Sequence, residues 1–412
     1  MTVKNNIPAG YKDSAVGVIP QEWEVKRLVD LCQNTGDYGI NAPSVPYRED
    51  LPTYLRITDI DGWGKFIETD KVSVDNPNSS QFILREGDIV FARTGATVGK
   101  TYLYDSKDGQ LVFAGFLIRF TPNSNKAIPY YIKASTETAS YWNWVRIISQ
   151  RSGQPGINSV EYGAMKLAVP PLAEQRKIAE ILGVWDEAIE KQNRLIEKLE
   201  LRKRALMQRL LTGRTRLSGF IDDVQYKKLK PFIVEKSERN TNQTYTNVLS
   251  VTNNRGFINQ AEQFDREVAS DNTANYKLVH RGQFAYNPSR VNVGSLDLLQ
   301  TYDLGILSPM YIVFETRPTM DPKFLHYQLK SGWFVGHIPM YVQGSVRDSL
   351  SFDGLENMKF WIPSLTEQKA IAEVLTTADN EIATHRKKLD ALRLQKHGLM
   401  QQLLTGKTRV KI

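Results

Sequence analysis

One long segment of this chain occurs twice, 193 residues apart and without a gap. The copies run from Pro170 to Arg216 and from Pro363 to Arg409. Identical residues occupy 22 of the 47 paired positions, and the copies end in LLTGRTR and LLTGKTR. Similarity over this length at a fixed period indicates two half-molecules in series. The sequence therefore predicts an internal pseudo-two-fold duplication, and a partner or substrate that also has two parts.

Each copy carries apolar residues at alternating steps of four and three, the period of a coiled-coil seam. In the first copy the seam residues are Ile178, Leu182, Trp185, Ile189, Ile196, Leu199, Leu206 and Leu210. In the second copy they are Ile371, Leu375, Ala378, Ile382, Leu389, Leu392, Leu399 and Leu403. Polar residues interrupt both seams at matching places: Gln192 and Lys203, and His385 and Lys396. Because polar seam residues usually fix register, we expect two long helices that pack on each other as an intramolecular coiled coil.

The ends of both helices are marked in the sequence. Glu174 and Glu367 lie in the expected first turns, where a carboxylate suits the helix dipole. Gly213 and Gly406 follow the last leucines, where a glycine terminates a helix. A core helix of a globular domain is the alternative, but the apolar pattern is too long and too narrow for it.

A segment of different texture precedes each repeat. Short runs rich in β-branched and aromatic residues alternate there with Gly, Asn and Pro. The runs are YLRITDI, DIVFAR and LVFAGFLIRF in the first segment, and YTNVLSV, GQFAYNP and MYIVFE in the second. Gly87 and Gly99 correspond to Gly282 and Gly294. We therefore predict an α+β fold, with two mixed α/β domains separated by two long helices.

The expected boundaries follow from the repeat. The first domain, with the N-terminal segment, is residues 1–168, and the first helix is 169–216. The second domain is residues 217–361, and the second helix is 362–412. Because the helices stayed alike while the domains diverged, we interpret the helices as a common scaffold that carries two different recognition surfaces.

Composition and charge indicate which kinds of partner and which cellular compartment to expect. The formal net charge of +8 is compatible with a polyanionic partner such as nucleic acid. The single cysteine, Cys32, has no partner for a disulfide, as is usual in a reducing cytosol. The sequence has no apolar run long enough to span a membrane and no signal-peptide core. We expect a soluble, cytoplasmic protein.

The sequence contains three features that could suggest catalysis or ligand binding, and each lacks a residue or a spacing that the function needs. Residues 95–101 (GATVGKT) resemble a phosphate-binding loop, but the glycine spacing is one residue short and a strand-like segment follows. Residues 287–290 (NPSR) lack the aromatic residue that stacks on a flipped base in amino-methyltransferases. The five histidines never occur at metal-ligand spacing. We predict no catalytic residue, no cofactor site and no metal site on this chain.

Polar loops in the two β-rich segments remain as candidates for DNA binding. Arg, Asn and Gln read base edges, whereas Ser, Thr and Lys suit phosphate oxygens. The candidates in the first domain are Arg93, Thr94, Thr97, Lys100, Arg151, Gln154 and Asn158. The candidates in the second domain are Arg290, Asn292, Gln343 and Arg347. Taken singly, each is more typical of an ordinary solvated loop, and their recurrence at matching places in both halves raises a binding role to an equal alternative.

The helix motifs PPLAEQRKIAEIL and LMQRLLTG and the opening segment GVIPQEWEVKRLVDL strongly resemble the specificity subunit of type I restriction–modification systems, the HsdS family. The resemblance covers essentially the whole chain, in the order target-recognition domain, helix, target-recognition domain, helix. The helix motifs are specific to this family. The recognition domains match only in general texture, and the LLTG endings look most like the subfamily with short, closely similar halves.

The resemblance implies a DNA-binding specificity subunit that recognises an asymmetric bipartite site in double-stranded DNA. The two helices, antiparallel, would set the gap between the half-sites and offer a surface to two methyltransferase (M) subunits. Restriction/translocase (R) subunits would join to give the restriction complex. S-adenosylmethionine, ATP and Mg would belong to those partners, so this chain would be a noncatalytic component.

Three alternatives stay open at the level of sequence. The chain could be a duplicated coiled-coil adaptor that binds protein or RNA. It could be an autonomous methyltransferase or nuclease, which saturable binding of S-adenosylmethionine by the chain alone would reveal. It could also serve a modification-only system that has no nuclease.

Overall fold

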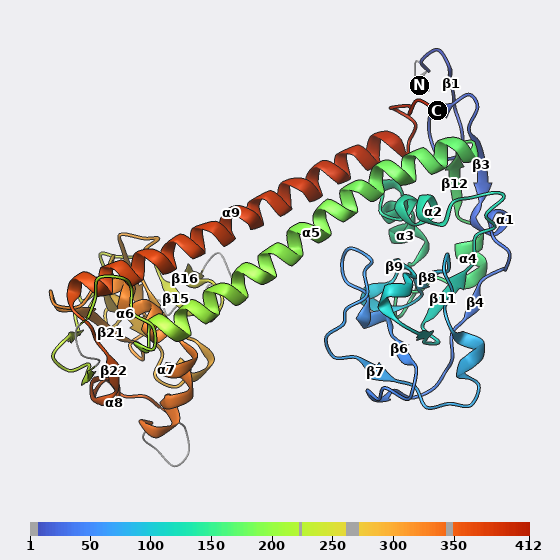
Figure 1. The fold of residues 1–412 in the computed structure, drawn as a ribbon. Coiled ribbons are helices and arrows are strands. Elements are labelled where there is room, and N and C mark those ends of the chain that lie inside the picture. Colours follow the sequence, from blue (N-terminus) through green and yellow to red (C-terminus); the bar gives the residue numbers. More distant parts are fainter. Residues whose placement is uncertain (1–6, 222–224, 261–271, 343–348) are drawn as a thin grey trace. The chain divides into compact units, whose positions relative to one another are not determined.

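The computed structural model describes residues 7–221, 225–260, 272–342 and 349–412 (Figure 1). The chain forms two compact units. The first comprises Met1–Lys191 with Leu389–Ile412, and the second comprises Gln192–Lys388. Within the described ranges, no helix is long and apolar enough to cross a membrane.

The two long helices predicted from the repeat are confirmed. Helix α5 spans Leu172–Leu210 and helix α9 spans Leu365–Leu403, and each has 39 residues. Each helix begins in one unit and ends in the other, so every unit holds part of α5 and part of α9. Equal length is what a duplicated scaffold is expected to show.

The predicted seam residues are buried or partly buried, and none is exposed. The buried ones in the first unit are Ile178, Leu182, Leu389 and Leu403. Those in the second unit are Ile196, Leu199, Leu210, Ile371, Leu375, Ala378 and Ile382. Trp185, Ile189, Leu206, Leu392 and Leu399 are partly buried. Burial of such an apolar stripe removes it from water. This hydrophobic effect is the main contribution to the association of two helices.

The second unit shows the direction of pairing. Gln192 Nε2 donates to the carbonyl of His385 over 3.0 Å and lies 2.8 Å from its Nδ1. Lys203 Nζ lies 2.5 Å from Asp379 Oδ1. Residue numbers rise along α5 as they fall along α9, so the helices are antiparallel. The polar seam residues are thus satisfied by partners on the facing helix, as register-setting residues must be.

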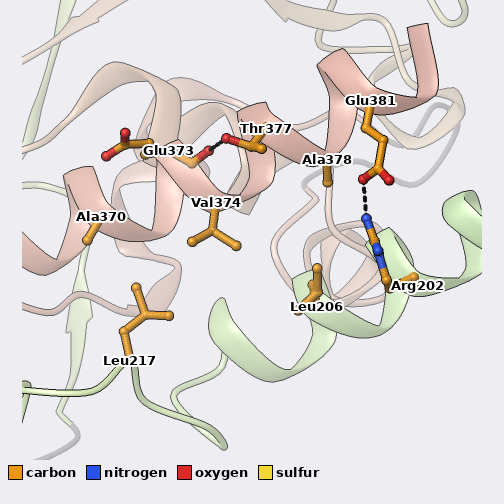
Figure 2. Close-up of a pocket in the computed structure, with 9 residues that line it drawn as sticks. All are labelled: Arg202, Leu206, Leu217, Ala370, Glu373, Val374, Thr377, Ala378 and Glu381. Atoms are coloured by element: carbon orange, nitrogen blue, oxygen red, sulfur yellow. Dashed lines mark hydrogen bonds and ion pairs between the residues drawn. The ribbon is translucent and has the colours of Figure 1, made fainter. Parts of the chain in front are cut away.

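The same unit contains a hollow of about 500 Å³ between its halves of α5 and α9 (Figure 2). Ala378 on its wall is the seam counterpart of Trp185, and the short alanine side chain leaves space there. The Arg202–Glu381 ion pair lies on one side of the hollow. The remaining lining residues are Leu206, Leu217, Ala370, Glu373, Val374 and Thr377. No pair of these groups is arranged as a nucleophile and its base, so the hollow is a packing feature of the scaffold.

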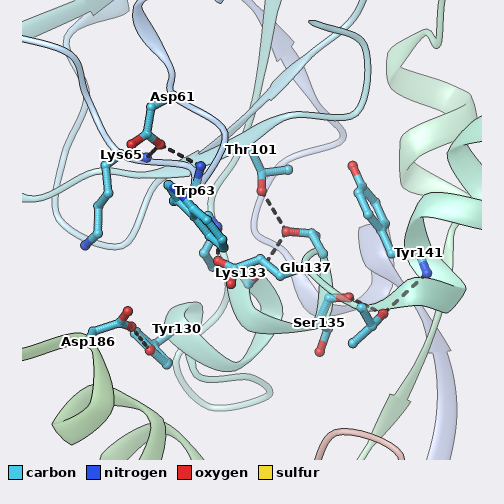
Figure 3. Close-up of polar contacts among 12 residues, drawn as sticks. Asp61, Trp63, Lys65, Thr101, Tyr130, Lys133, Ser135, Glu137, Tyr141 and Asp186 are labelled. Atoms are coloured by element: carbon cyan, nitrogen blue, oxygen red, sulfur yellow. Dashed lines mark hydrogen bonds and ion pairs between the residues drawn. The ribbon is translucent and has the colours of Figure 1, made fainter. Parts of the chain in front are cut away.

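A tyrosine from each domain joins the helix pair through an aspartate. In the first unit, Tyr130 donates to Asp186, which also accepts from Lys396 Nζ over 2.8 Å (Figure 3). In the second unit, Tyr327 donates to Asp379 over 2.7 Å, and Asp379 also pairs with Lys203. The aspartates and the lysines are exact repeat counterparts, 193 residues apart. The lysines that interrupt the seams therefore link helix to helix and, through the aspartates, helix to domain.

A loop of the first domain makes a further contact with helix α9. Asp61 accepts from the backbone amides of Trp63 and Lys65 and shapes a tight loop (Figure 3). The Trp63 ring lies 4.8 Å from the guanidinium carbon of Arg393 on α9. A cation over an aromatic face contributes about 0.5–1 kcal/mol at an exposed site. The loop thus adds a modest contact between domain and helix.

A buried carboxylate fixes the start of each long helix. Arg409 donates through Nε and Nη2 to Glu174 over 2.7 and 3.0 Å. Arg216 donates in the same way to Glu367 over 2.7 and 2.6 Å. The glutamates are almost fully buried, with 1% and 0% of the side chain exposed. The first-turn glutamates therefore do more than suit the helix dipole, because each binds the arginine that follows the end of the other helix.

The glutamines that follow these glutamates hold the domains. Gln175 Oε1 accepts from the amide of Ile128, and Gln368 Oε1 accepts from the amide of Asp321. Both amides lie at the start of a helix that begins with proline, where a backbone N–H lacks a helical partner. The Glu-Gln pair of each repeat thus couples one long helix to its domain and to the end of the other long helix.

Both long helices end at a glycine, as the sequence predicts. Gly213 has φ +71° and Gly406 has φ +70°, a backbone conformation that glycine adopts readily. A Cβ atom at Gly406 would lie 2.4 Å from Pro20 Cδ, and one at Gly213 would lie 2.9 Å from Trp361 Cε2. The glycines therefore end the helices and also allow the attached domain to approach closely.

The first domain contains two four-stranded sheets and short helices. One sheet has the order β10-β6-β7-β5, and the other has the order β4-β11-β8-β9. Their strands are β4 (Asp37–Tyr38), β5 (Val45–Pro46), β6 (Thr53–Leu55), β7 (Val72–Ser73), β8 (Ile89–Ala92), β9 (Thr101–Leu103), β10 (Leu111–Phe113) and β11 (Leu117–Phe120). The other elements are β1 (Tyr11–Lys12), β2 (Ile19–Pro20), β3 (Glu24–Arg27), β12 (Lys166–Val169), α1 (Leu28–Leu31), α2 (Pro129–Ser135), α3 (Ala139–Ile148) and α4 (Ser159–Gly163).

The second domain repeats the central part of this plan. Its described sheets have the orders β14-β21-β18-β19, β15-β16, β17-β20 and β13-β22. The strands are β13 (Tyr226–Lys228), β14 (Ile233–Lys236), β15 (Leu249–Thr252), β16 (Gly256–Asn259), β17 (Lys277–His280), β18 (Phe284–Tyr286), β19 (Leu296–Leu298), β20 (Leu304–Leu307), β21 (Ile312–Thr316) and β22 (Lys359–Trp361). The helices are α6 (Pro322–Leu329), α7 (Gly332–His337) and α8 (Phe352–Asn357).

The central antiparallel pair has the same register in both domains. Ile118 of β11 pairs with Phe91 of β8, and Ile312 of β21 pairs with Tyr286 of β18. All strand residues of β8 and β18 are buried, so these strands lie in the domain cores. The β-rich run LVFAGFLIRF forms two strands, β10 and β11, in different sheets, because a turn at residues 114–117 breaks it.

The buried ion pair of the second unit gives a stability prediction. Arg216→Ala leaves the carboxylate of Glu367 buried without its bidentate partner, so we expect a loss of about 3–5 kcal/mol of unfolding free energy. Urea unfolding monitored by circular dichroism measures the change. The exposed neighbour Arg214 provides a matched control, because Arg214→Ala should change stability by no more than about 0.5 kcal/mol. Equal stability of the two variants would contradict the role given to the Glu367 pair.

Candidate nucleic-acid interface

The two candidate loops of the first domain lie side by side. Thr94 forms an isolated bridge with Gly156, and the amide of Gly95 donates to the carbonyl of Pro155 over 3.0 Å. The amide of Ile157 donates to the carbonyl of Arg93 over 2.8 Å. The structure therefore brings loop 93–100, which follows β8, against loop 150–158, although residues 101–149 separate them in the sequence.

Arg93 is the best-positioned cation of this surface. Its guanidinium carbon lies 4.9 Å from the centre of the Tyr38 ring, and Nη1 donates to the carbonyl of Gly115 over 3.4 Å. The Tyr38 hydroxyl accepts from the amide of Ser159 over 3.1 Å, which fixes the ring. A guanidinium stacked on an aromatic face keeps a defined direction and loses little entropy when it binds a ligand.

Three other candidates donate to backbone carbonyls, and a fourth, Gln154, lies beside Gly95. Lys100 Nζ donates to the carbonyl of Ile60 over 2.9 Å, and Thr97 donates to the carbonyl of Thr94 over 3.3 Å. The Thr94 hydroxyl donates to the carbonyl of Pro155 over 3.4 Å. Gln154 is exposed, and its Nε2 lies 2.9 Å from the place that a Cβ atom on Gly95 would occupy. These groups shape the surface as well as lining it.

Arg151 and Asn158 organise the second loop. Arg151 Nη2 donates to both carboxylate oxygens of Glu161 over 2.6 and 2.7 Å. Asn158 caps helix α4: its side chain accepts from the amide of Glu161, whose carboxylate accepts from the amide of Asn158. Such a capping box holds the loop end in place. Because Glu161 already balances the charge of Arg151, this arginine attracts an anionic ligand less strongly than Arg93 does.

The second domain presents a related surface with different side chains. Arg290 and Asn292 are both exposed, and the amide of Arg290 closes a turn on the carbonyl of Asn287 over 3.0 Å. The amide of Leu350 donates to the carbonyl of Pro288 over 3.1 Å, which repeats the bond from Ile157 to Arg93. Two further candidates, Gln343 and Arg347, lie outside the described residues.

The sequence did not single out the aromatic side of this interface. Tyr38 and Phe116 flank Arg93, and 40% and 56% of their surfaces are exposed. In the second domain Met310 is 60% exposed, and its sulfur accepts from Asn287 Nδ2 over 3.4 Å. Phe116 and Met310 belong to runs whose composition is typical of β-strands. In the sequence they therefore look like core residues, and only the structure shows that each lies in a turn.

Three features of the described residues bear on possible catalytic chemistry. It contains no cluster of three His, Cys, Asp or Glu side chains that could hold a metal ion. Cys32 is buried, and burial raises the pKa of its thiol to about 12, so the nucleophilic thiolate is scarce near neutral pH. Loop 95–101 leads into strand β9 and not into a helix, so it lacks the structure of a phosphate-binding loop.

The family model of the type I restriction modification DNA specificity domain matches residues 20–201 and 220–394 of this chain. The chain belongs to this family. The two matched stretches contain both recognition surfaces and most of both long helices. Specificity subunits are noncatalytic components of type I systems that serve DNA target recognition, and this chain is one of them.

Relatives and solved structures agree with this assignment. The chain is 26% identical to the putative type I restriction enzyme MjaX specificity subunit of Methanocaldococcus jannaschii, over 97% of either chain. It is 24% identical to the MjaVIII specificity subunit of the same organism, over 95% of this chain and 94% of the relative.

Two solved structures have a similar fold. The S subunit of a type I restriction-modification system from M. genitalium aligns over 98% of either chain with a TM-score of 0.55 and 14% identity. A chain from work on complex assembly and conformational transition of the type I R-M system aligns over 95% of this chain and 99% of its own length. Its TM-score is 0.54 and its identity is 16%. The fold of a specificity subunit thus extends along the whole chain.

The geometry of Arg93 gives a prediction for DNA binding by this specificity subunit. Arg93→Ala should weaken discrimination among DNA sequences by about 1–3 kcal/mol for each base contact that is lost. Its stability should stay within about 1 kcal/mol of the wild type, because among the described residues the guanidinium makes one long hydrogen bond and one stacking contact. Competition binding with duplex libraries measures the discrimination.

Arg151→Ala is the informative comparison, because Glu161 holds that arginine. We expect it to reduce the stability of the loop and to affect DNA binding less than Arg93→Ala does. If Arg93→Ala weakened binding to all sequences equally, Arg93 would be a phosphate contact and not a base contact.

Proposed function

We propose that this specificity subunit recognises an asymmetric, bipartite site in double-stranded DNA. The two target-recognition domains, residues 1–168 and 217–361, would each bind one half of the site in the major groove. The two helices, residues 169–216 and 362–412, would set the gap between the halves. This function belongs to the cytoplasm, where chromosomal and invading DNA are both reached.

One observation carries the proposal. The same surface, at the end of the same buried strand, recurs in both domains with different side chains: Arg93 with Tyr38 in one, Asn287 with Arg290 in the other. Base edges are distinguished by the donors and acceptors that face them, so different side chains favour different base sequences. Two unlike surfaces on a duplicated scaffold support two unlike half-sites.

The long helices would also dock the catalytic subunits. Leu201 on α5 and Leu394 on α9 are repeat counterparts, and both are largely exposed, at 61% and 73%. An exposed leucine is common, but the same exposed leucine in both copies favours a shared role. We infer that each is the centre of one binding site for a methyltransferase (M) subunit. Those subunits would carry S-adenosylmethionine, and the restriction/translocase (R) subunits would bring ATP and Mg.

Leu201 and Leu394 allow a direct test of docking. Leu201→Glu should remove one M subunit and Leu394→Glu the other, because a buried, unpaired carboxylate opposes association. Native mass spectrometry of the co-purified complex counts the M subunits. We expect two for the wild type, one for each single variant and none for the double variant. Thr384→Glu, at another exposed helix position, is the control and should keep both. Retention of two M subunits in the double variant would contradict this docking site.

Removal of matched heptads tests the role of the helices as a spacer. The heptads are 192–198 and 385–391, which occupy equivalent places in the two copies. Within each unit the remaining residues keep their antiparallel partners, because both helices shorten together. Seven residues correspond to about 10 Å of helix, or about three base pairs.

We therefore expect the gap between the half-sites to shorten by up to about three base pairs, with both half-sites unchanged. Sequencing of methylated adenines in cells that also express the M subunit measures the gap. The single deletion 192–198 is the control, and it should impair methylation because it leaves α9 without matching seam partners. A changed half-site sequence with an unchanged gap would contradict the proposal.

A further inference from the structure

A tight turn lies beside the candidate DNA surface of each domain and exposes a large apolar side chain. In the first domain the turn is residues 114–117, closed by a bond from the Leu117 amide to the Ala114 carbonyl over 2.8 Å. In the second it is residues 308–311, closed from Tyr311 to Ser308 over 3.0 Å. Phe116 and Met310 occupy the same third position of these turns and are 56% and 60% exposed.

The backbone fixes Phe116 next to Arg93. The amide of Arg93 donates to the carbonyl of Phe116 over 3.0 Å, and the guanidinium donates to the neighbouring carbonyl of Gly115. Leu117, the next residue, is fully buried and pairs with Ala92 at the end of β8. The exposed ring is therefore held by rigid structure on both sides.

Met310 has an equivalent environment. Tyr311, the next residue, is buried, and Asn287 follows directly after strand β18. The side-chain Nδ2 of Asn287 donates to the sulfur of Met310 over 3.4 Å, and the backbone carbonyl of Asn287 accepts the turn bond from Arg290. An exposed apolar side chain thus lies beside an arginine-bearing loop in both domains.

The recurrence is the argument for function. A single exposed apolar residue needs no explanation. These two, however, occupy the same turn position in domains whose sequences have diverged, and each adjoins the polar loop that follows the central strand. Phe and Met are both side chains that proteins place against bases, either on the thymine methyl group or between neighbouring base pairs.

We propose that Phe116 and Met310 are apolar base contacts, one for each half-site, and that they determine sequence preference together with the neighbouring polar loops. The inference rests on the proposed function, because it assigns base-reading residues to the same DNA surface. Arg93 and Arg290 would bind polar base edges or phosphates, and the apolar side chains would cover base surface that has no hydrogen-bonding group.

The test uses the complex of this chain with its cognate M subunit and duplexes that carry every base at each position of the mapped target. Methylation rates give the preference at each base pair. Phe116→Ala should reduce the preference at one position of one half-site by about 5- to 20-fold and leave the other half-site unchanged. Met310→Ala should do the same in the other half-site. Phe116→Leu should keep part of the preference.

Tyr47→Ala is the matched control in the first domain. Tyr47 is 48% exposed, but it follows β5, which β6 and β7 separate from β10 in the sheet. Its variant should keep the wild-type preference at every position. Unchanged preference in Phe116→Ala or Met310→Ala, or an equal loss for all sequences, would overturn the assignment. If the wild-type complex methylated no two-part site, the proposed function itself would be wrong, whatever the variants did.

Discussion

The antiparallel pairing of α5 and α9 is the constraint on which the rest of the structure depends. Each unit holds part of both helices, so neither domain has a complete scaffold without the other copy of the repeat. The buried pairs Glu174–Arg409 and Glu367–Arg216 each join the start of one helix to the residues after the end of the other. A charge buried to this degree is tolerated only with its partner, so these pairs favour one register over its alternatives.

Both copies of the repeat bind their domain through the same kinds of contact. The domain residues that make these contacts, however, differ in position or in type. Asp186 and Asp379 each accept from a tyrosine of the attached domain, yet Tyr130 lies in the first turn of its helix and Tyr327 in the second. The glycine at each helix end meets Pro20 in one unit and Trp361 in the other. The scaffold thus holds two domains that have diverged in sequence, which is what two different half-sites require.

Much of the scaffold was predictable from the sequence, because a coiled-coil seam has a regular period and the repeat shows that period twice. The long helices, their glycine ends and the alternation with β-rich domains follow from patterns that local physics imposes. The partners of the polar seam residues did not follow, since Asp379 and Asp186 lie in the helices at positions with no distinctive spacing. The run LVFAGFLIRF concealed a turn because glycine and small residues also occur within strands. For that reason Phe116 was missed, whereas Arg93 was recognised from its loop. Tyr38 was missed because it lies in the two-residue strand β4, outside the β-rich runs of the sequence.

We propose that two unlike surfaces on a duplicated scaffold recognise two unlike DNA sequences at a fixed separation. A map of methylated adenines in cells that express this chain with its cognate M subunit tests this proposal. We expect one motif of two different short sequences, separated by a gap of constant length and arbitrary sequence. A palindromic or uninterrupted motif, or methylation that does not depend on this chain, would contradict it.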